Sequence, residues 1–549
     1  MKKNISFKII LLLGWLFSVL PVKSQNDFEI AKNVDIFVSI LKELNSKYAD
    51  EINPADLTKT AIDAMLNSLD PYTVYYPESQ IEDFRLMTTG QYGGIGAIIQ
   101  QHETGIVISE PYEDSPAALV GLCAGDRIIK INNQSVAGKS SDEVSTFLKG
   151  EPGTSLSIEI ERPGSTKTQI FNVVRKEIKL PNIPYYGMLE NHIGYIKLDQ
   201  FTENAGNEVK AAFQKLKEEN MNYLILDLRN NGGGLLHEAV NIMNIFVDQN
   251  TLISSTKGKI KEQTNNFRTR MPVLDKHIPV VVLVNEFSAS ASEIVAGAFQ
   301  DLDRGVVVGK KTFGKGLVQN VVPLSYNSSL KITVSKYYIP SGRCVQNVDY
   351  FVKDSLTPTS EIPDSLAISY KTKNGRTVYD KGGIYPDIVT PDSMASNLLI
   401  TLVMNNLIFD FANQYYHTHS TILPANQFVV NDQIYKDFTD FLKGKEYSYT
   451  TDSEHLLEDL KRIAQEEHLF TTIEPLFNEI KTKIEAEKAN ELQKFKQEVS
   501  SYLTSEIATR YYYQKGRIMS ALSSDPDVTI AKNLLRDSSK YKSILSNKK

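Results

Sequence analysis

PVVVLVNEFSASASEIVAGAFQDLDRGVVVGKKTFGKGLVQNVV, residues 279–322, contains the strongest structural signals of the chain. Within it, the apolar runs Pro279–Val284 and Gly305–Gly309 each predict a fully buried strand. Between them, Asn285–Phe287 predicts a turn and Glu293–Gln300 predicts a helix. A cluster of serines therefore lies at a strand-to-helix turn, and a lysine bracketed by glycines, FGKG, follows the second strand. A serine and an accessible lysine in this setting suggest nucleophilic catalysis without histidine.

The segment before this stretch alternates strands and helices. Ile193–Leu198 and Asn222–Leu228 predict strands, whereas Asn204–Glu219 and Leu235–Phe246 have the periodicity of helices. A glycine run, RNNGGG, joins the second strand to the second helix. This alternation predicts an α/β core with a largely parallel sheet.

Residues 85–178 differ from the core, because short β runs alternate there with turn residues. The loop YGGIG precedes a predicted strand, and a short helix, the turn GDRI and further strands follow. This order resembles a PDZ domain of the permuted bacterial type, an α+β fold. The resemblance implies that a peptide carboxylate binds backbone N–H groups of the loop, which consists of Tyr92, Gly93, Gly94, Ile95 and Gly96. Taken alone, the glycines are explained equally well by a tight turn.

The two ends of the chain differ in pattern from the core and from the PDZ-like domain. Met1–Lys8 carries three lysines, and the apolar run Ile9–Val22 that follows is shorter than the roughly 20 residues of a membrane span. This pattern is typical of a signal peptide cleaved after Ser24, and it predicts export to the periplasm; an uncleaved membrane anchor is the alternative. Residues 25–84 and 395–549 have helical periodicity.

The predicted fold is therefore an α/β multidomain protein with an inserted α+β domain. The length of 549 residues easily allows several domains. The predicted parts are a signal peptide at 1–24, an N-terminal helical region at 25–84, the PDZ-like domain at 85–178, an α/β core at 179–394 and a C-terminal helical domain at 395–549.

Composition narrows the classes of function. The net charge of −6 becomes about −10 on removal of the signal peptide, which carries four lysines and no acidic residue. An acidic mature chain argues against a nucleic-acid partner. The two cysteines, Cys123 and Cys344, lie far apart and are expected to be free, mostly buried thiols. His417 and His419 have metal-like spacing, but no cysteine or further histidine joins them, so neither a metal nor another cofactor is expected.

The serine and lysine motifs also have simpler explanations. Ser290 and Glu293 have the S-x-x-E spacing of a helix capping box. Gly309–Lys315 matches a phosphate loop, but Gly316 occupies the Ser/Thr position and a strand follows where a helix should begin. Three features together favour catalysis. A helix N-terminus offers N–H groups to a developing oxyanion, a second glycine loop follows another core strand, and an apolar setting would lower the pKa of the lysine.

The PDZ-like domain, LRNNGGGL, NEFSASASEIVAGAFQD and FGKGLVQ, in this order, are similar to the carboxyl-terminal processing (tail-specific) serine proteases. The resemblance covers about residues 60–390. It implies a Ser–Lys dyad with Ser290 as the nucleophile and Lys315 as the general base, and it places a lysine-orienting glutamine at Gln319. The three serines alone do not identify the nucleophile; the spacing to the lysine in the resembling family selects Ser290.

The same resemblance implies an oxyanion hole made of two backbone N–H groups. One falls on Ala291 and the other on Gly232 or Gly233, because the three-glycine run allows more than one register. A lysine accepts a serine proton only when it is neutral, yet its ordinary pKa is about 10.4. Lowering this value to about 7–8 takes roughly 3–4 kcal/mol of bias against the charged form, which burial can supply.

The expected function is an exported serine endopeptidase that cuts proteins near their C-termini, with the PDZ domain binding the tail or gating the site. The expected partners are proteins or peptides with free C-termini, and an adaptor protein and a second copy bound through the C-terminal helices are further candidates. One alternative is a catalytically silent PDZ scaffold. Another is an enzyme of acyl-thioester chemistry, since α/β cores with glycine-rich oxyanion loops also suit that reaction.

Overall fold

The computed structural model describes residues 22–165, 167–350, 360–361, 367–380, 382–391 and 395–546. The predicted signal peptide at 1–24 lies outside these ranges apart from its last three residues, so its cleavage and the export of the chain stay predictions. The chain divides into two compact units, Met1–Tyr75 and Tyr76–Lys549. None of the helices in the described ranges is both long and apolar enough to span a membrane.

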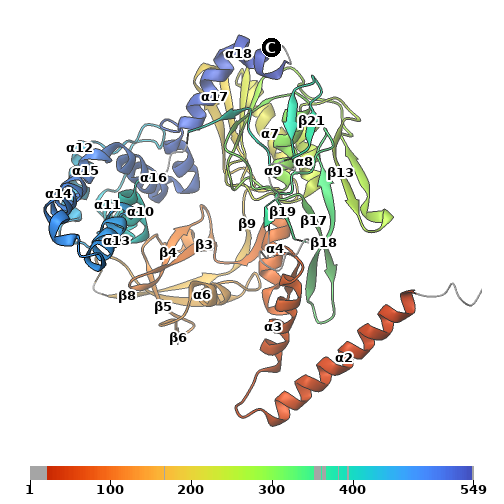
Figure 1. Ribbon diagram of the computed structural model, residues 1–549, viewed down its shortest axis with the longest axis horizontal. Helices are drawn as coiled ribbons and strands as arrows, with labels where there is room; N and C mark the ends of the chain where they lie inside the picture. Colours follow the sequence, from red (N-terminus) through yellow and green to blue (C-terminus); the bar gives the residue numbers. More distant parts are fainter. Residues whose placement is uncertain are drawn as a thin grey trace, which may run out of the picture. The chain divides into compact units, whose positions relative to one another are not determined.

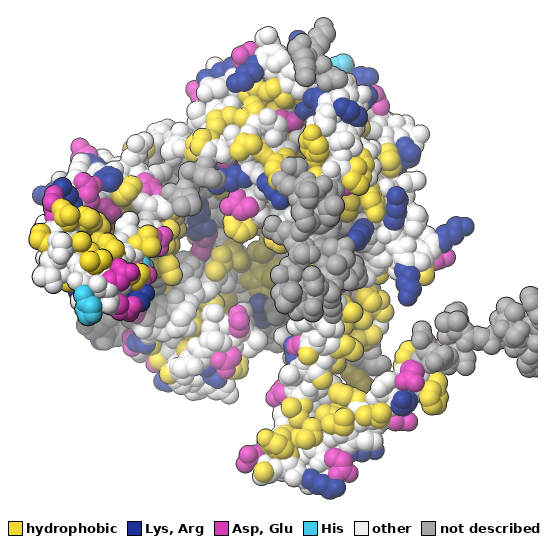
Figure 2. Space-filling model, viewed as in Figure 1, with side chains coloured by type: hydrophobic (Ala, Val, Ile, Leu, Met, Phe, Trp, Pro, Cys, Tyr) yellow, Lys and Arg dark blue, Asp and Glu magenta, His cyan; other side chains and the backbone are white. Residues whose placement is uncertain are grey.

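The first unit is mainly helical, as predicted, and contains α2 (Val22–Lys47) and α3 (Pro54–Asn67) (Figure 1). α3 begins at Pro54 because a proline is favoured at the first helical position and the Asn53 side chain accepts the Ala55 N–H (3.0 Å). Apolar side chains along α2 are exposed, as Figure 2 shows.

The α/β core of the second unit is built on a six-stranded sheet with the order β10–β11–β12–β15–β16–β23. Its strands are β10 (Tyr185–Leu189), β11 (Ile193–Lys197), β12 (Tyr223–Asp227), β15 (Val280–Val284), β16 (Val306–Gly309) and β23 (Ile388–Val389). Neighbouring strands from β11 to β23 are parallel, and β10 is antiparallel to β11. The predicted α/β core with a parallel-rich sheet is thus confirmed.

Both faces of this sheet are buried. One face is covered by three helices, which are α7 (Ala205–Glu218), α8 (Leu236–Met243) and α9 (Ala291–Asp301). Val280, Val282 and Val284 of β15 pack with these helices, whereas Val281 and Leu283 pack on the opposite face. Burial on both sides explains why the core strands are continuous apolar runs in the sequence.

The second face is covered by two helices from the C-terminal part of the chain, α17 (Pro526–Arg536) and α18 (Ser538–Leu545) (Figure 1). The Val280 N–H donates to the Tyr541 hydroxyl (2.9 Å), and this hydroxyl donates to the Val280 carbonyl (3.0 Å). The sequence division at residue 395 assigns both helices to the C-terminal helical region, yet by packing they complete the core.

An antiparallel hairpin follows the last long strand of the core sheet. It consists of β17 (Leu317–Pro323) and β18 (Ser329–Tyr338), and β18 also pairs with β13 (Leu252–Gly258). The hairpin therefore continues directly from the FGKG motif and places β18 beside it.

The PDZ-like domain is an α+β fold inserted before β10. Its sheet has the order β3–β4–β5–β7–β8, with β3 (Ala97–His102), β4 (Gly105–Pro111), β5 (Arg127–Ile131), β7 (Ser155–Glu161) and β8 (Thr168–Val174). Helix α6 (Ser141–Leu148) contacts the edge strand β3. A separate antiparallel pair, β2 (Gln91–Gly94) with β9 (Lys176–Lys179), joins the two ends of the domain.

The C-terminal helical domain has a core of its own. Its helices are α10 (Asn397–Met404), α11 (Leu407–Thr418), α12 (Asp432–Phe441), α13 (Asp452–Glu466), α14 (Phe470–Ala489), α15 (Glu491–Lys494) and α16 (Lys496–Ala521). Leu402, Phe411, Phe438, Leu503 and Ile507 are among the buried residues that α10, α11, α12 and α16 pack together. The predicted helical C-terminal region is confirmed.

Candidate active site

Two loops leave the same edge of the core sheet, because β12 and β15 are parallel neighbours. Residues 229–234, the glycine loop, follow β12, and residues 285–290, the serine loop, follow β15. The Ala289 N–H donates to the Asn231 carbonyl (3.0 Å), and the Asn230 N–H donates to Asn285 Oδ1 (2.9 Å). The structure thus brings the RNNGGG and SASAS motifs together.

The three serines of SASAS differ in burial. Ser288 and Ser292 are both fully buried. The Ser288 hydroxyl donates to the Leu228 carbonyl (2.8 Å), and the Ser292 hydroxyl donates to the Asn231 carbonyl (2.9 Å). Ser290 alone of the three is partly exposed. The outer serines are therefore accounted for by loop packing, and the middle one is presented at the surface.

Ser290 has a strained backbone that its neighbours hold in place. Its φ of 56° and ψ of −113° lie in a region that residues other than glycine rarely occupy. The Ser290 N–H donates to Glu293 Oε2 (2.8 Å), and the Tyr337 hydroxyl donates to the Ser290 carbonyl (3.1 Å). A serine in such a conformation at a strand-to-helix turn resembles the exposed nucleophiles of hydrolases with an α/β core.

Glu293 is a buried carboxylate that joins the serine to the lysine motif. It accepts the N–H groups of Ser290 (2.8 Å), Gly314 (2.7 Å) and Lys315 (2.9 Å) and the hydroxyl of Thr312 (2.6 Å). Burial raises its pKa, and the hydrogen bonds that it accepts oppose this shift. The S-x-x-E spacing suggested only a cap. A further sequence signal for Glu293 was a charged residue within the mostly apolar stretch Ala291–Phe299.

Lys315 lies in residues 310–316, the lysine loop, between β16 and β17. Its N–H and that of Ser290 bond the same oxygen of Glu293, so the two nitrogens lie within two hydrogen-bond lengths of each other. The Phe313 N–H also donates to the Ser288 carbonyl (3.1 Å). The Lys315 side chain is half-buried, so the environment provides part of the desolvation that a neutral lysine requires.

The glycines that flank Lys315 are required by close packing. A Cβ on Gly314 would lie 2.5 Å from that of Asn347, and a Cβ on Gly316 would lie 2.7 Å from the Gln346 nitrogen. The sequence suggested that these glycines leave the lysine accessible; the structure adds a second reason for them. They let the lysine loop approach the neighbouring backbone.

Gln319 lies on β17, and its Nε2 donates to Thr333 Oγ1 (3.2 Å) on the neighbouring β18. This bond holds the amide between the two strands of the hairpin. Its predicted role in orienting Lys315 stays a prediction.

Gly233 is the residue of the glycine loop that meets the serine. Its φ is +99°, and an added Cβ would lie 2.7 Å from the Ser290 Cβ and 2.9 Å from the Ala291 nitrogen. A Cβ on Gly232, by contrast, would have no atom of the described residues within 4 Å. The Gly233 N–H donates to Asn231 Oδ1 (2.8 Å), so a substrate oxygen would have to share or displace this bond. Ala291 is the first residue of α9, where the N–H groups of a helix are not used by the helix itself.

Arg229, the first residue of the glycine loop, lies in a cluster of charges that was not predicted from the sequence. Its guanidinium donates to Asp227 (2.6 Å), to Asp525 (2.7 Å) and to Asp527 (3.1 Å). Asp227 is fully buried, which acts to raise its pKa, but the charges of Arg229 and Lys197 prevail and lower it to about 2. All three aspartates are therefore held against one arginine at the base of the loop.

The YGGIG segment was expected to be a loop, but its first three residues form part of a strand. Tyr92, Gly93 and Gly94 belong to β2, and the Gly93 N–H donates to Glu82 Oε2 (2.8 Å). A Cβ on Gly93 would lie 2.1 Å from the Gly150 carbonyl oxygen, so close packing explains this glycine. Ile95 is buried in the PDZ-like core, and Gly96, with φ of +74°, leads into β3. Peptide binding by these residues stays a prediction.

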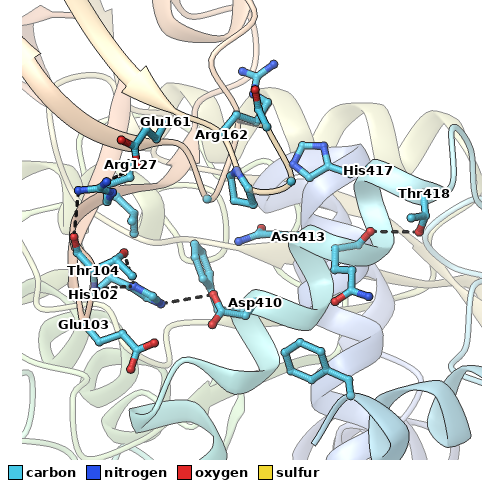
Figure 3. A pocket seen from close by; sticks show the side chains of 18 of the residues that line it. His102, Glu103, Thr104, Arg127, Glu161, Arg162, Asp410, Asn413, His417 and Thr418 are labelled. Carbon is cyan, nitrogen blue, oxygen red and sulfur yellow. Dashed lines mark hydrogen bonds and ion pairs between the residues drawn. The ribbon is translucent and has the colours of Figure 1, made fainter. Parts of the chain in front are cut away.

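A cavity of about 820 Å³ lies between the PDZ-like domain and α11 (Figure 3). His102 points toward Asp410 of α11, with 3.4 Å between Nε2 and Oδ1, and the Thr104 N–H donates to His102 Nδ1 (3.2 Å). Burial raises the pKa of Asp410, while His102 opposes this shift. The described residues that line the cavity include none of the predicted catalytic ones. It therefore belongs to the contact between two domains rather than to the site at Ser290.

Cys123 and Cys344 are free thiols, as expected, although each is half-buried rather than buried. Burial raises the pKa of both thiols, which keeps them protonated and unreactive.

Known families match the chain in three places. Peptidase family S41 matches residues 192–362, a PDZ domain matches residues 107–162, and the C-terminal helical domain of a probable PDZ-protease matches residues 398–535. Along the chain, these matches fall on the PDZ-like domain, the core and the C-terminal helical domain of the structure, in that order.

Several curated proteins are similar to the chain over most of its length. A carboxy-terminal-processing protease of Bartonella bacilliformis is 33% identical over 354 residues, which are 64% of this chain and 80% of that protein. Probable CtpA-like serine proteases of Staphylococcus epidermidis and Staphylococcus aureus are 35% and 33% identical. The matched parts are 59% and 66% of this chain and 65% and 72% of those proteins.

Solved structures also align with the chain. The photosystem II D1 C-terminal processing protease is 27% identical, with 66% of this chain and 88% of that chain covered and a TM-score of 0.35. A putative S41 protease from Bacteroides fragilis is 16% identical, with 68% and 92% covered and a TM-score of 0.37.

Proposed function

The chain belongs to the carboxy-terminal-processing proteases, peptidase family S41, and from this we propose that it is a serine endopeptidase with Ser290 as nucleophile and Lys315 as general base. One observation carries the assignment of the pair. A single buried carboxylate, Glu293, bonds the backbone N–H groups of both residues and so fixes their spacing.

The proposed reaction begins when Ser290 Oγ attacks the carbonyl carbon of the scissile peptide bond while its proton passes to the neutral Lys315 amine. The carbonyl oxygen becomes an oxyanion, which the N–H groups of Ala291 and Gly233 stabilise. Collapse of this intermediate breaks the C–N bond, and the leaving amine takes the proton from Lys315. Water then attacks the Ser290 ester, again giving a proton to Lys315, and the freed serine takes it back.

Lys315 must be neutral for both proton transfers, and its half-buried position supports a lowered pKa. Gln319 is a neutral amide, so it can hold the amine without favouring the ammonium form as a carboxylate would. We expect kcat to rise with pH through the neutral-to-alkaline range as Lys315 loses its proton. A flat profile between about pH 6 and 9 would contradict this role, since a lysine tuned as a base titrates there.

The proposed substrates are proteins with free, extended C-terminal tails. The edge strand β3 and the neighbouring helix α6 support this, because an extended peptide can add a strand at such an edge. The N-terminal sequence supports export of the chain, with the periplasm as the proposed compartment.

Cleavage of a fluorogenic peptide with an apolar C-terminal tail tests the proposal. Wild-type protein should cleave it, and Ser290→Ala and Lys315→Ala should each lower kcat by at least about a thousandfold while circular dichroism and the melting temperature stay unchanged. Tail binding without cleavage by the wild type would support the scaffold alternative instead.

A further inference from the structure

We infer that Asp525 and Asp527, from the N-terminus of α17, are positioning residues of the glycine loop and act through Arg229. This inference deepens the proposed function and rests on it, because the glycine loop matters only if Gly233 serves the oxyanion. The start of α17, almost three hundred residues after Arg229 in the sequence, would thereby influence the geometry of the active site.

The guanidinium of Arg229 is occupied on every side. Nε and Nη2 donate to Asp227, Nη2 also donates to Asp525 Oδ2 (2.7 Å), and Nη1 donates to Asp525 Oδ1 and Asp527 Oδ2 (both 3.1 Å). The Arg229–Asp525 pair is bidentate, which fixes direction as well as distance. Because each N–H is used, the side chain cannot turn without breaking contacts to both β12 and α17.

The Asp525 carboxylate is itself fixed. Asp525 is the N-cap of α17, and its Oδ1 accepts the N–H groups of Asp527 (2.9 Å) and Val528 (3.0 Å). The helix is held on the core sheet by buried residues, which include Val528, Ala531, Leu534 and Leu535. Asp525 therefore connects a rigid helix end to the first residue of the glycine loop.

The glycine loop needs such an anchor. Gly233 and Gly234 have φ of +99° and +145°, and glycine loses more backbone freedom on ordering than any other residue. Arg229 is also held by its carbonyl, which accepts a hydrogen bond from Lys197 Nζ (2.6 Å). The backbone and the side chain of Arg229 are thus both held. The glycine loop therefore starts toward Ser290 from a fixed position.

A simpler reading is that the aspartates only dock α17 on the core. The chain offers a matched control, because α17 makes a second set of ion pairs with the same core. Lys532 and Arg536 contact Glu190 at 2.7 and 3.1 Å, with no contact to the glycine loop among the described residues. Docking should depend on both sets, whereas loop position should depend on the aspartates alone.

The experiment compares Asp525→Asn/Asp527→Asn with Lys532→Ala/Arg536→Ala in the full chain. Asparagine also caps helices well, so the first variant keeps the start of α17 and removes the charges. We expect kcat to fall about tenfold to a hundredfold with KM within about threefold, since a small misplacement at a reacting centre can cost this much. The affinity of a peptide boronate, which takes up the tetrahedral geometry at Ser290, should fall by a similar factor, and the control should keep both values.

Hydrogen exchange of residues 229–234 gives a readout that does not require cleavage. It should speed up in the aspartate variant and stay unchanged in the control. Equal losses in the two variants, or unchanged exchange and kcat in the aspartate variant, would overturn the inference. If wild-type protein cleaves nothing, the proposed function fails, while the exchange data still decide whether the aspartates hold the loop.

Discussion

The glycine loop and the lysine loop approach Ser290 from two sides and are held by different kinds of contact. Charged groups anchor the glycine loop, since Arg229 bonds Asp227, Asp525 and Asp527. The lysine loop is bonded instead to one buried carboxylate, Glu293, through backbone N–H groups and a hydroxyl.

The difference predicts how each loop responds to acid. Opposite charges lower the pKa of Asp227 to about 2 despite its burial, so its ion pairs persist far into the acid range. Burial raises the pKa of Glu293, so this carboxylate takes up a proton at a higher pH. On acidification the lysine loop should therefore lose its anchor before the glycine loop does.

Apart from the loss of Ser290 or Lys315 themselves, the largest expected effect comes from Gly233→Ala, on the glycine-loop side. Its Cβ would lie 2.7 Å from the Ala289 carbonyl oxygen and from the Ser290 Cβ, and a φ of +99° is strained for alanine. We expect kcat to fall about 10²–10³-fold, as when an oxyanion donor is lost, because the clash would move the backbone N–H of residue 233 away from the oxyanion. Steady-state kinetics would show it, with Gly232→Ala as the control, because no described atom lies within 4 Å of that Cβ. Equal losses of kcat in both variants would contradict a specific role of Gly233 in the oxyanion hole.

Glu293→Gln tests the other side of the comparison. A glutamine oxygen cannot accept from all four donors that Glu293 binds, and each buried donor left unpaired costs about 1–3 kcal/mol. We expect roughly 3 kcal/mol of lost stability and a fall in kcat of about a hundredfold as Lys315 moves away from Ser290. Chemical denaturation and kinetics would measure the two effects.

A matched control for this variant is Glu238→Gln. Glu238 is also a buried core carboxylate, but it accepts the N–H of Gly206 (2.7 Å) on α7 rather than an N–H of the lysine loop. Its kcat should stay near that of the wild type. If Glu293→Gln kept full activity, the lysine loop would not depend on this carboxylate.

Asp227→Asn should reveal a contribution to stability that depends on pH. The folded-state pKa of Asp227, about 2, lies below the value of about 3.9 for an unfolded aspartate. Its charge therefore stabilises the fold above about pH 4, and this contribution disappears as the pH falls through 2. It amounts to roughly 2–3 kcal/mol, from about 1.36 kcal/mol per pKa unit. Calorimetric melting temperatures of the two proteins should differ at pH 7 and converge toward pH 2; a gap that does not change with pH would refute the charge-based anchor.

The smallest effect is expected for Ser292→Ala, which sharpens the choice among the three serines. The hydroxyl of this buried serine donates to the Asn231 carbonyl, so its loss should cost about 1 kcal/mol of stability. Activity should stay within about threefold of the wild type, because the change leaves Ser290 in place. A loss as complete as that expected for Ser290→Ala would mean that the nucleophile has been assigned to the wrong serine.

The sequence predicted the elements whose signals are local. β15, α9 and β16 follow from apolar runs that both faces of the sheet bury, and the inserted α+β domain follows from its short strands and turns. Glycine and serine positions at strand ends likewise predicted that two loops would meet. The pattern alone did not identify the nucleophile among the three serines. The choice of Ser290 came from the resemblance.

The contacts that hold the site were not predictable, because their partners are far apart in the sequence. Nothing near Arg229 indicates Asp525, and the S-x-x-E spacing of Ser290 and Glu293 does not show that Glu293 also binds the lysine loop. The close packing at several glycines was unpredictable for a related reason. At Gly93, Gly314 and Gly316, a side chain would collide with neighbouring atoms. These close approaches are visible only in three dimensions.

The late position of α17 and α18 in the sequence has a consequence for synthesis. Translation completes the serine and lysine motifs long before Pro526–Arg536 emerges, and until then Val281 and Leu283 lack their cover and Arg229 lacks two of its aspartates. A nascent chain should therefore be unable to digest its neighbours until its last helices have folded back. Ribosome-arrested chains that end before Pro526 should resist labelling of Ser290 by a fluorophosphonate, whereas released full-length chains should react.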